Sequence, residues 1–182
     1  MAKINLLTPQ VYNRIAAGEV VERPYSVVKE LVENAVDAGA TEITVSVYQG
    51  GISRIRVSDN GCGIEKTELP KVFLPHATSK IARAEDLDAI ATLGFRGEAL
   101  ASIASVSQIT VRSRTADNDI GGEISSCGGV PSDVTDCAIA RGTEITVDKL
   151  FFNTPVSLGL FEDTLCFSLI PISFSAFLAS FS

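Results

Sequence analysis

The spacing of apolar and polar residues predicts an amphipathic helix near the start of the chain. The apolar positions between residues 24 and 37 fill one half of a helical wheel. They are Val27, Val28, Leu31, Val32, Ala35 and Val36. The other half is polar and carries Ser26, Lys29, Glu30, Glu33, Asn34 and Asp37. Pro24 suits a first helical turn and Gly39 suits a position just beyond a helix end, so we expect a helix over about Pro24 to Asp37.

An alternating pattern then predicts a β-hairpin. The apolar residues of segment 41–48 fall on one face, as in a half-buried strand, and are Ile43, Val45 and Val47. The sequence Gln49-Gly50-Gly51 predicts a turn, and Ile55 and Val57 continue an antiparallel partner. An all-parallel sheet is therefore not expected.

Weaker patterns predict the remaining elements. We expect a short helix over about 66–73, started or kinked by Pro70, a second over 85–93, and a third opening at Gly97 and running to Ala104. Strands are predicted at about 108–114 and 143–147, with a glycine-rich loop between them. Helices interleaved with paired strands indicate an α+β domain.

Charge and cysteine content narrow the possible functions. The net charge of −7 and the scattering of the 15 Lys and Arg residues argue against a free-standing nucleic-acid binder, so any contact with DNA is expected to be weak. The four cysteines form no CxxC pair and His76 is the only histidine, which argues against a Cys/His zinc site. The first residues show no secretory signal, so we expect an intracellular, cytoplasmic protein.

The polar face of the first helix is a candidate metal and catalytic site. Glu30 and Asn34 are four residues apart and project together. A carboxylate beside a carboxamide suits hydrated Mg²⁺, and the carboxylate could accept a proton from an attacking water. The alternative is an ordinary solvated helix face.

Three loops are further candidates. Asp59-Asn60-Gly61-Cys62-Gly63 directly follows a strand, and a buried Asp59 could accept from the amino group of adenine while the glycines admit a flat ring. The glycines of segment 94–100 could present N–H groups to phosphate at a helix start. Segment 76–80 could cover a nucleotide with hydroxyls and an ammonium group. A surface turn, a helix cap and a plain connector are the respective alternatives.

In combination these strings resemble one family. IAAGEVVERP (15–24), SVVKELVENAVDAGA (26–40), DNGCGI, HATSKI, LGFRGEALASI and LFFNTP (150–155) occur in this order. The resemblance is to the GHKL ATPase superfamily and, within it, to the MutL family of DNA mismatch-repair proteins, over about residues 4–156. It implies a two-layer α/β sandwich of the GHKL (Bergerat) type, with helices on one face of a mixed, largely antiparallel sheet.

The resemblance also implies roles for individual residues. Glu30 would be the general base for ATP hydrolysis, Asn34 the Mg²⁺ ligand and Asp59 the residue that binds the adenine amino group. Gly61 and Gly63 would shape that pocket, and Thr143 would close its adenine side. The nucleotide lid would comprise Thr78, Ser79 and Lys80. The phosphate cradle would comprise Gly94, Phe95, Arg96, Gly97, Glu98, Ala99 and Leu100.

The resemblance implies an ATP-driven repair switch that dimerises on nucleotide binding and works with mismatch-recognition proteins of the MutS type, away from membranes. The alternatives are a non-catalytic product that binds nucleotide weakly, and another GHKL enzyme such as a kinase. The family draws a phosphate-contacting lysine from a second domain, which we do not find in this chain, so its activity is left open.

The chain changes character after the ATPase-like region. We expect an ATP-binding domain over 1–156 and an atypical apolar tail over 157–182, rich in Ser and Phe and without Lys or Arg. Its composition resembles translation in a wrong frame or from an unrelated exon. The alternatives are a short membrane anchor, an edge strand and a core-filling tail.

Overall fold

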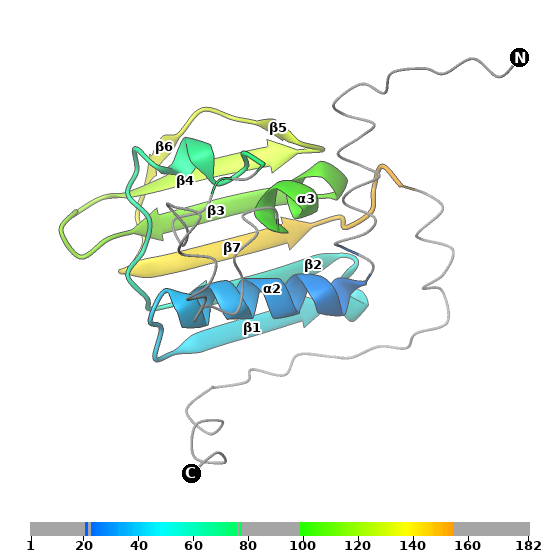
Figure 1. Cartoon of the computed structure of the whole chain (residues 1–182), viewed down its shortest axis with the longest axis horizontal. Helices are drawn as coiled ribbons and strands as arrows, with labels where there is room; N and C mark the ends of the chain where they lie inside the picture. Colours follow the sequence, from blue (N-terminus) through cyan, green and yellow to red (C-terminus); the bar gives the residue numbers. More distant parts are fainter. Residues whose placement is uncertain (1–20, 22, 76, 78–98, 155–182) are drawn as a thin grey trace, which may run out of the picture.

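The computed structural model describes residues 21, 23–75, 77 and 99–154, and these form a seven-stranded sheet with α-helices on one face (Figure 1). The elements in chain order are α2 (Pro24–Asp37), β1 (Ile43–Tyr48), η1 (Gln49–Gly51), β2 (Arg54–Asp59), η2 (Leu69–Lys71), α3 (Ala99–Val106), β3 (Gln108–Arg114), β4 (Gly121–Cys127), β5 (Val130–Pro131), β6 (Thr135–Cys137) and β7 (Gly142–Asp148). The strand order is β1-β2-β7-β3-β4-β5, with β6 also paired to β4. Every pairing between these described strands is antiparallel, which confirms the α+β class and the largely antiparallel sheet.

Helix α2 has the predicted bounds and orientation. Pro24 stands in its first turn behind an extended Arg23, and the side chains of Val27, Leu31 and Ala35 are buried against the sheet. Beyond the helix, Gly39 adopts a φ of +71° and donates its N–H to the carbonyl of Val36 at 2.9 Å. This left-handed residue ends the helix as predicted.

The core lies between the helices and the sheet. Alternate residues of the central strands point toward α2 and α3 and are almost fully buried. They are Ile55, Val57, Ile109, Val111, Ile124, Ile145 and Val147. Burial of each such side chain stabilises the fold by about 1.5–3 kcal/mol before the entropy of ordering is subtracted. The sheet is therefore held to the helices by one continuous apolar face.

The prediction of a loop between the strands at 108–114 and 143–147 is wrong. Strands β4, β5 and β6 lie there and extend the sheet beyond β3. The core-facing positions of β4 are Gly122, Ile124 and Ser126, so only one bulky apolar residue marks the strand. A side chain at Gly122 would approach the Cδ1 atom of Leu69 to 2.5 Å, because Leu69 packs directly on this strand.

The weaker helix predictions had mixed outcomes. Segment 66–73 contains only the short 3-10 helix η2, which has Pro70 in its first turn and buries Leu69 completely. The third predicted helix corresponds to α3, and its expected opening at Gly97 lies outside the described residues, as does the whole of 85–93. Among the described helices, none is long and apolar enough to cross a membrane.

Candidate functional site

A row of polar side chains ends the apolar face of the sheet on the helix side. The cross-strand register places Asp59 of β2 opposite Thr143 of β7, and Thr143 opposite Ser113 of β3. The next row inward, two residues along each strand, is apolar and consists of Val57, Ile145 and Val111. The polar row lies at one end of the central strands, where β2 and β3 end and β7 begins, beside the C-terminal end of α2 (Figure 1).

Asp59 is the acidic member of this row and is half-buried. Its Oδ1 atom accepts the N–H of Gly61 at 2.8 Å. Burial raises the pKa of the Asp59 carboxyl, and hydrogen bonds from the backbone of Gly61 and Thr143 partly oppose that rise. The group is thus a carboxyl brought partly out of water at the end of a core, which is an environment typical of binding sites.

The loop after Asp59 is tied to its surroundings through the backbone. The Asn60 side chain accepts the N–H groups of Thr41 at 2.9 Å and Glu42 at 3.0 Å, so it anchors the loop to the start of β1. The N–H of Cys62 donates to the carbonyl of Ala38 at 2.9 Å, which joins the loop to the end of α2. These contacts hold Asp59 in one orientation.

The glycines around Asp59 lie where other parts of the chain leave no space. A Cβ atom at Gly142 would lie 2.0 Å from the carbonyl oxygen of Asp59, and one at Gly63 would lie 2.2 Å from the carbonyl oxygen of Arg114. At Gly61 a Cβ would lie 2.9 Å from Ala38 and from the Asp59 carboxylate. The recorded close contacts of Gly61 and Gly63 are therefore with the chain itself, and their approach to a flat ring stays a prediction.

Two hydroxyl groups meet beside the carboxylate. The Oγ atoms of Ser113 and Thr143 lie 2.9 Å apart, and both side chains are buried. The Ser113 hydroxyl also lies 2.9 Å from the carbonyl oxygen of Gly142 and accepts the N–H of Ile64 at 2.8 Å. Ser113 of β3 thus connects β7 and the loop after β2 at the base of the polar row.

The predicted metal and base residues lie on α2. Glu30 and Asn34 are half-buried and one helical turn apart, so a carboxylate and a carboxamide project from the same side of the helix. The neighbouring Lys29 and Glu33 form an ion pair at 3.1 Å on the more exposed side. Oxygen donors of this kind fit Mg²⁺. Within the described part of the chain no group of three or more His, Cys, Asp and Glu side chains is arranged to hold a metal.

The structure thus brings together some of the predicted residues and leaves others aside. Asp59, Gly61, Gly63 and Thr143 form one cluster, while Glu30 and Asn34 lie on the helix that covers the same face of the sheet (Figure 1). The lid residues and most of the phosphate cradle lie outside the described residues: Thr78, Ser79, Lys80, Gly94, Phe95, Arg96, Gly97 and Glu98. Ala99 and Leu100 form the half-buried first turn of α3.

Two residues at the site, Ser113 and Arg141, are not predicted from the sequence. Ser113 lies within strand β3, and a serine at such a position gives no sequence signal of a functional role. Arg141, directly before β7, donates its Nε–H to the carbonyl of Gly61 at 3.2 Å and so ties the start of β7 to the Asp59 loop. Its position directly before Gly142-Thr143 is the only sequence signal that could have indicated it.

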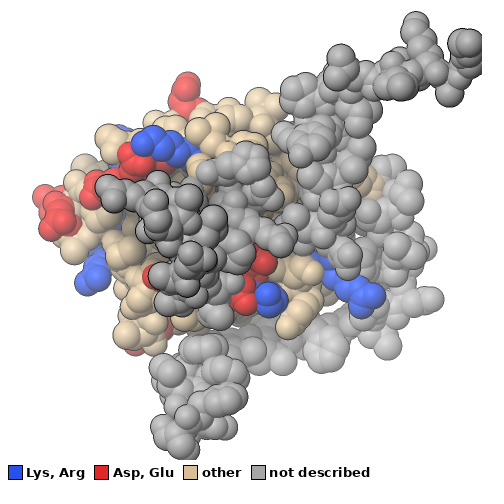
Figure 2. Space-filling view, viewed as in Figure 1, with Lys and Arg blue, Asp and Glu red and all other residues tan. Residues whose placement is uncertain are grey.

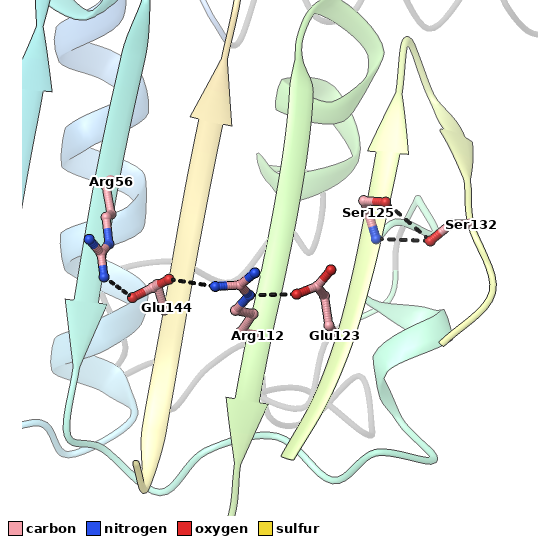
Figure 3. A network of polar contacts seen from close by, with 6 residues as sticks. All are labelled: Arg56, Arg112, Glu123, Ser125, Ser132 and Glu144. Atoms are coloured by element: carbon pink, nitrogen blue, oxygen red, sulfur yellow. Dashed lines mark hydrogen bonds and ion pairs between the residues drawn. The ribbon is translucent and has the colours of Figure 1, made fainter. Parts of the chain in front are cut away.

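The opposite face of the sheet carries a ladder of alternating charges (Figure 3). Arg56 pairs with Glu144, and Arg112 bridges Glu144 at 3.7 Å and Glu123 at 2.5 Å. The guanidinium groups of this ladder are thus matched by carboxylates. The helix-side surface likewise shows Lys and Arg interspersed with Asp and Glu where atoms are described (Figure 2).

A shallow hollow on that opposite face is lined by Thr44, Ser46, Arg56 and Ser58. These residues alternate with the core-facing positions of β1 and β2, so the hollow opens away from Asp59. Exposed ion pairs such as Arg56–Glu144 contribute about 0–1 kcal/mol each, and we read this face as a solvated surface.

Comparisons with known proteins agree with this arrangement. Residues 22–125 match the family described as histidine kinase-, DNA gyrase B-, and HSP90-like ATPase. The chain is 55% identical over 162 residues to the DNA mismatch repair protein MutL of Clostridium acetobutylicum, which covers 89% of this chain and 26% of that protein. The chain therefore spans about a quarter of the length of the curated relatives it matches.

Solved structures give the same result. The Aquifex aeolicus MutL ATPase domain complexed with ADP is similar at a TM-score of 0.58 and 36% identity, over 79% of this chain and 49% of that one. An N-terminal domain of a DNA repair protein matches at a TM-score of 0.69 and 33% identity, over 84% of this chain and 43% of that one. The chain belongs to the histidine kinase-, DNA gyrase B- and HSP90-like ATPase family, and within it to the N-terminal ATPase region of the MutL type.

Proposed function

We propose that this chain binds ATP with Mg²⁺ and hydrolyses it as the nucleotide-driven part of a mismatch-repair protein. The observation that carries the proposal is the polar row at the ends of the central strands, where a half-buried Asp59 lies opposite Thr143 next to the apolar core. Adenine needs such an arrangement, because its exocyclic amino group requires an acceptor and its ring requires apolar surroundings.

Asp59 would accept the adenine amino group. Its carboxylate is fixed by the N–H of Gly61 and by the loop that Asn60 and Arg141 anchor. Gly61 and Gly63 keep this loop close to α2 and to the end of β3. The presence of ADP in the similar Aquifex aeolicus MutL structure supports the assignment of an adenine nucleotide.

Glu30 and Asn34 would act at the phosphate end. Asn34 would hold Mg²⁺ through its carboxamide oxygen, and the bound ion would offset the negative charge of the phosphates. Glu30, one turn earlier on the same side of α2, would orient a water and accept its proton. The donor types and the shared helix side support these roles.

The remaining phosphate contacts are proposed from the sequence strings alone. Thr78, Ser79 and Lys80 would form the lid, and residues 94–100 the cradle at the start of α3. Of these, Ala99 and Leu100 belong to the described first turn of α3. N–H groups at a helix start suit phosphate oxygens.

At the level of the whole protein, we propose a switch that closes and dimerises on nucleotide binding and acts with a mismatch-recognition protein of the MutS type. Contact with DNA through this domain would be weak, since the described surface charges alternate in sign. A role in DNA repair would place the protein inside the cell, in the cytoplasm of a bacterium.

Calorimetric titration of the 182-residue chain with ADP and Mg²⁺ tests the proposal. We expect saturable binding that Asp59→Asn weakens about tenfold or more, because a hydrogen bond to a charged acceptor is worth about 1.5–3 kcal/mol. The matched control is Asp117→Asn, which changes an exposed carboxylate in the loop after β3. A folded wild-type chain that binds no ADP at millimolar concentration would refute the proposal.

A further inference from the structure

We infer that Ser113 is a positioning residue that fixes the hydroxyl of Thr143 as a hydrogen-bond acceptor, and that this selects a base with an amino group over one with a carbonyl. The inference rests on the proposed function, since it deals with the same end of the site. Ser113 is not itself one of the proposed adenine-binding residues, but it contacts one of them, Thr143. Ser113 is 1% exposed, and strand β7 separates it from Asp59.

The hydroxyl oxygen of Ser113 is buried and has three hydrogen-bonding partners. Three groups lie within hydrogen-bonding distance of Ser113 Oγ: the N–H of Ile64 at 2.8 Å, the carbonyl oxygen of Gly142 at 2.9 Å and the hydroxyl oxygen of Thr143 at 2.9 Å. Ile64 can only donate to this oxygen and Gly142 can only accept from it. The hydroxyl of Thr143 can do either.

Ser113 has one proton to donate. If it donates to the Gly142 carbonyl, Thr143 donates to Ser113 and all three hydrogen bonds form at once. If Ser113 donates to Thr143 instead, the bond to Gly142 is lost and only two remain. Because these groups are buried, the arrangement with three bonds is favoured.

This arrangement determines what Thr143 offers to a ligand. Its only hydroxyl proton is used on Ser113, so its lone pairs are left to accept. Thr143 is directly opposite Asp59 across the strand pair, and an ionised Asp59 also only accepts. The Asp59 carboxylate and the Thr143 hydroxyl oxygen are then two adjacent hydrogen-bond acceptors. They favour a ligand group that donates a hydrogen bond and disfavour a carbonyl oxygen, which is itself an acceptor.

A base with an amino group therefore fits, and the same base with a carbonyl in its place does not. Adenine and hypoxanthine differ in this respect at one ring position. Ser113 touches neither base and acts through Thr143. Without Ser113, the Thr143 hydroxyl is free to turn its proton toward the ligand and to donate to a carbonyl.

The experiment compares the binding of ADP and of inosine diphosphate to the 182-residue chain, and the measured quantity is the ratio of their dissociation constants. We expect the wild-type chain to favour ADP, and we expect Ser113→Ala to lower that preference roughly tenfold, the value of about one hydrogen bond. In a Thr143→Val background, which removes the hydroxyl, Ser113→Ala should leave the ratio unchanged. Ser113→Cys keeps the size of the side chain and serves if the alanine variant does not fold, with a several-fold decrease expected.

The outcomes separate the inference from the proposed function. A Ser113→Ala variant that binds both nucleotides equally more weakly has lost only structure, and would overturn the inference without contradicting the proposed function. A ratio that still falls in the Thr143→Val background would overturn it as well, because the effect would not pass through the hydroxyl. Failure of the folded wild-type chain to bind ADP would overturn the proposed function and the inference together.

Discussion

Gly142→Ala tests the geometry that places Asp59 at the end of β2, beside the start of β7. Gly142 has a φ of +119°, which side chains rarely allow, and it opens strand β7 directly before Thr143. A methyl group there would lie 2.0 Å from the carbonyl oxygen of Asp59 and 2.9 Å from the Cα of Asn60. The substitution therefore pushes on the backbone of the residue that the proposed function depends on most.

The size of the effect follows from these distances. A real Cβ essentially never comes closer than 3.0 Å to such an atom, so the backbone at Asp59 has to retreat by about 1 Å. The unfavourable φ costs about 1–3 kcal/mol and the displaced packing about 1–3 kcal/mol more. We expect a loss of roughly 3–5 kcal/mol in the free energy of unfolding, together with a marked loss of ADP affinity.

Gly39→Ala is the matched control. Gly39 also has a positive φ, of +71°, but a Cβ there would meet nothing within 4 Å. Its cost should be about 1–2 kcal/mol, the ordinary cost of a left-handed residue with a side chain. Both variants reduce the entropy of the unfolded chain in the same way, so that effect cancels between them.

Urea unfolding of both variants measures the difference. For an m-value of about 2 kcal/mol/M, a gap of ~3 kcal/mol shifts the midpoint by about 1.5 M. ADP titration of the folded proteins gives the second readout, in which Gly39→Ala should resemble the wild type. If Gly142→Ala were as stable as Gly39→Ala and bound ADP equally well, the close approach of β7 to Asp59 would not be a constraint and the reasoning would fail.

Three further predictions concern the same domain. Burial raises the pKa of the Asp59 carboxyl. The contribution of this carboxyl to the free energy of unfolding is therefore present below its ordinary pKa and is lost as pH rises through its pKa in the folded chain. Asp59→Asn should thus stabilise the nucleotide-free chain increasingly above about pH 4, as measured by urea unfolding across pH, while weakening ADP binding. Glu30→Ala should abolish ATP hydrolysis and retain ADP affinity, whereas Glu33→Ala on the same helix should retain both; equal losses in the two variants would contradict the assignment of Glu30 as the base. Deletion after Val156 should increase solubility and leave the melting temperature and ADP affinity unchanged, and a loss of several degrees would show that the tail is structural.

The fold was predictable where periodicity and end signals agreed. The residues of α2 combine helical spacing with Pro24 at one end and Gly39 at the other, and the helix has the predicted bounds. Strand β3 was predicted equally well because its apolar residues alternate. Strand β4 was missed because its core-facing positions include Gly122, where packing of Leu69 removes the apolar signal. Tertiary packing, and not local preference, determines such a strand.

The site was only partly predictable for a similar reason. Asp59, Gly61 and Gly63 are adjacent in sequence and form a recognisable string, whereas Thr143 joins them only through pairing of β2 with β7. Ser113 belongs to a third strand, and its contact with Thr143 spans 30 residues of sequence. No local pattern marks a serine that acts through a cross-strand neighbour.

The environment of Asp59 supports the proposal that the polar row binds a ligand. Within the described residues, burial raises the pKa of Asp59 and backbone hydrogen bonds from Gly61 and Thr143 lower it, and no Lys or Arg contributes. A carboxylate retained for stability would gain from a paired Lys or Arg, as Glu144 does from Arg56 on the opposite face. Burial raises the pKa of Asp59 and so disfavours its charged form, while contacts of Asn60 and Arg141 hold its loop. Rigid support for a group that is unfavourable by itself is what preorganised binding requires, because the partner supplies the missing hydrogen-bond donor only when it binds.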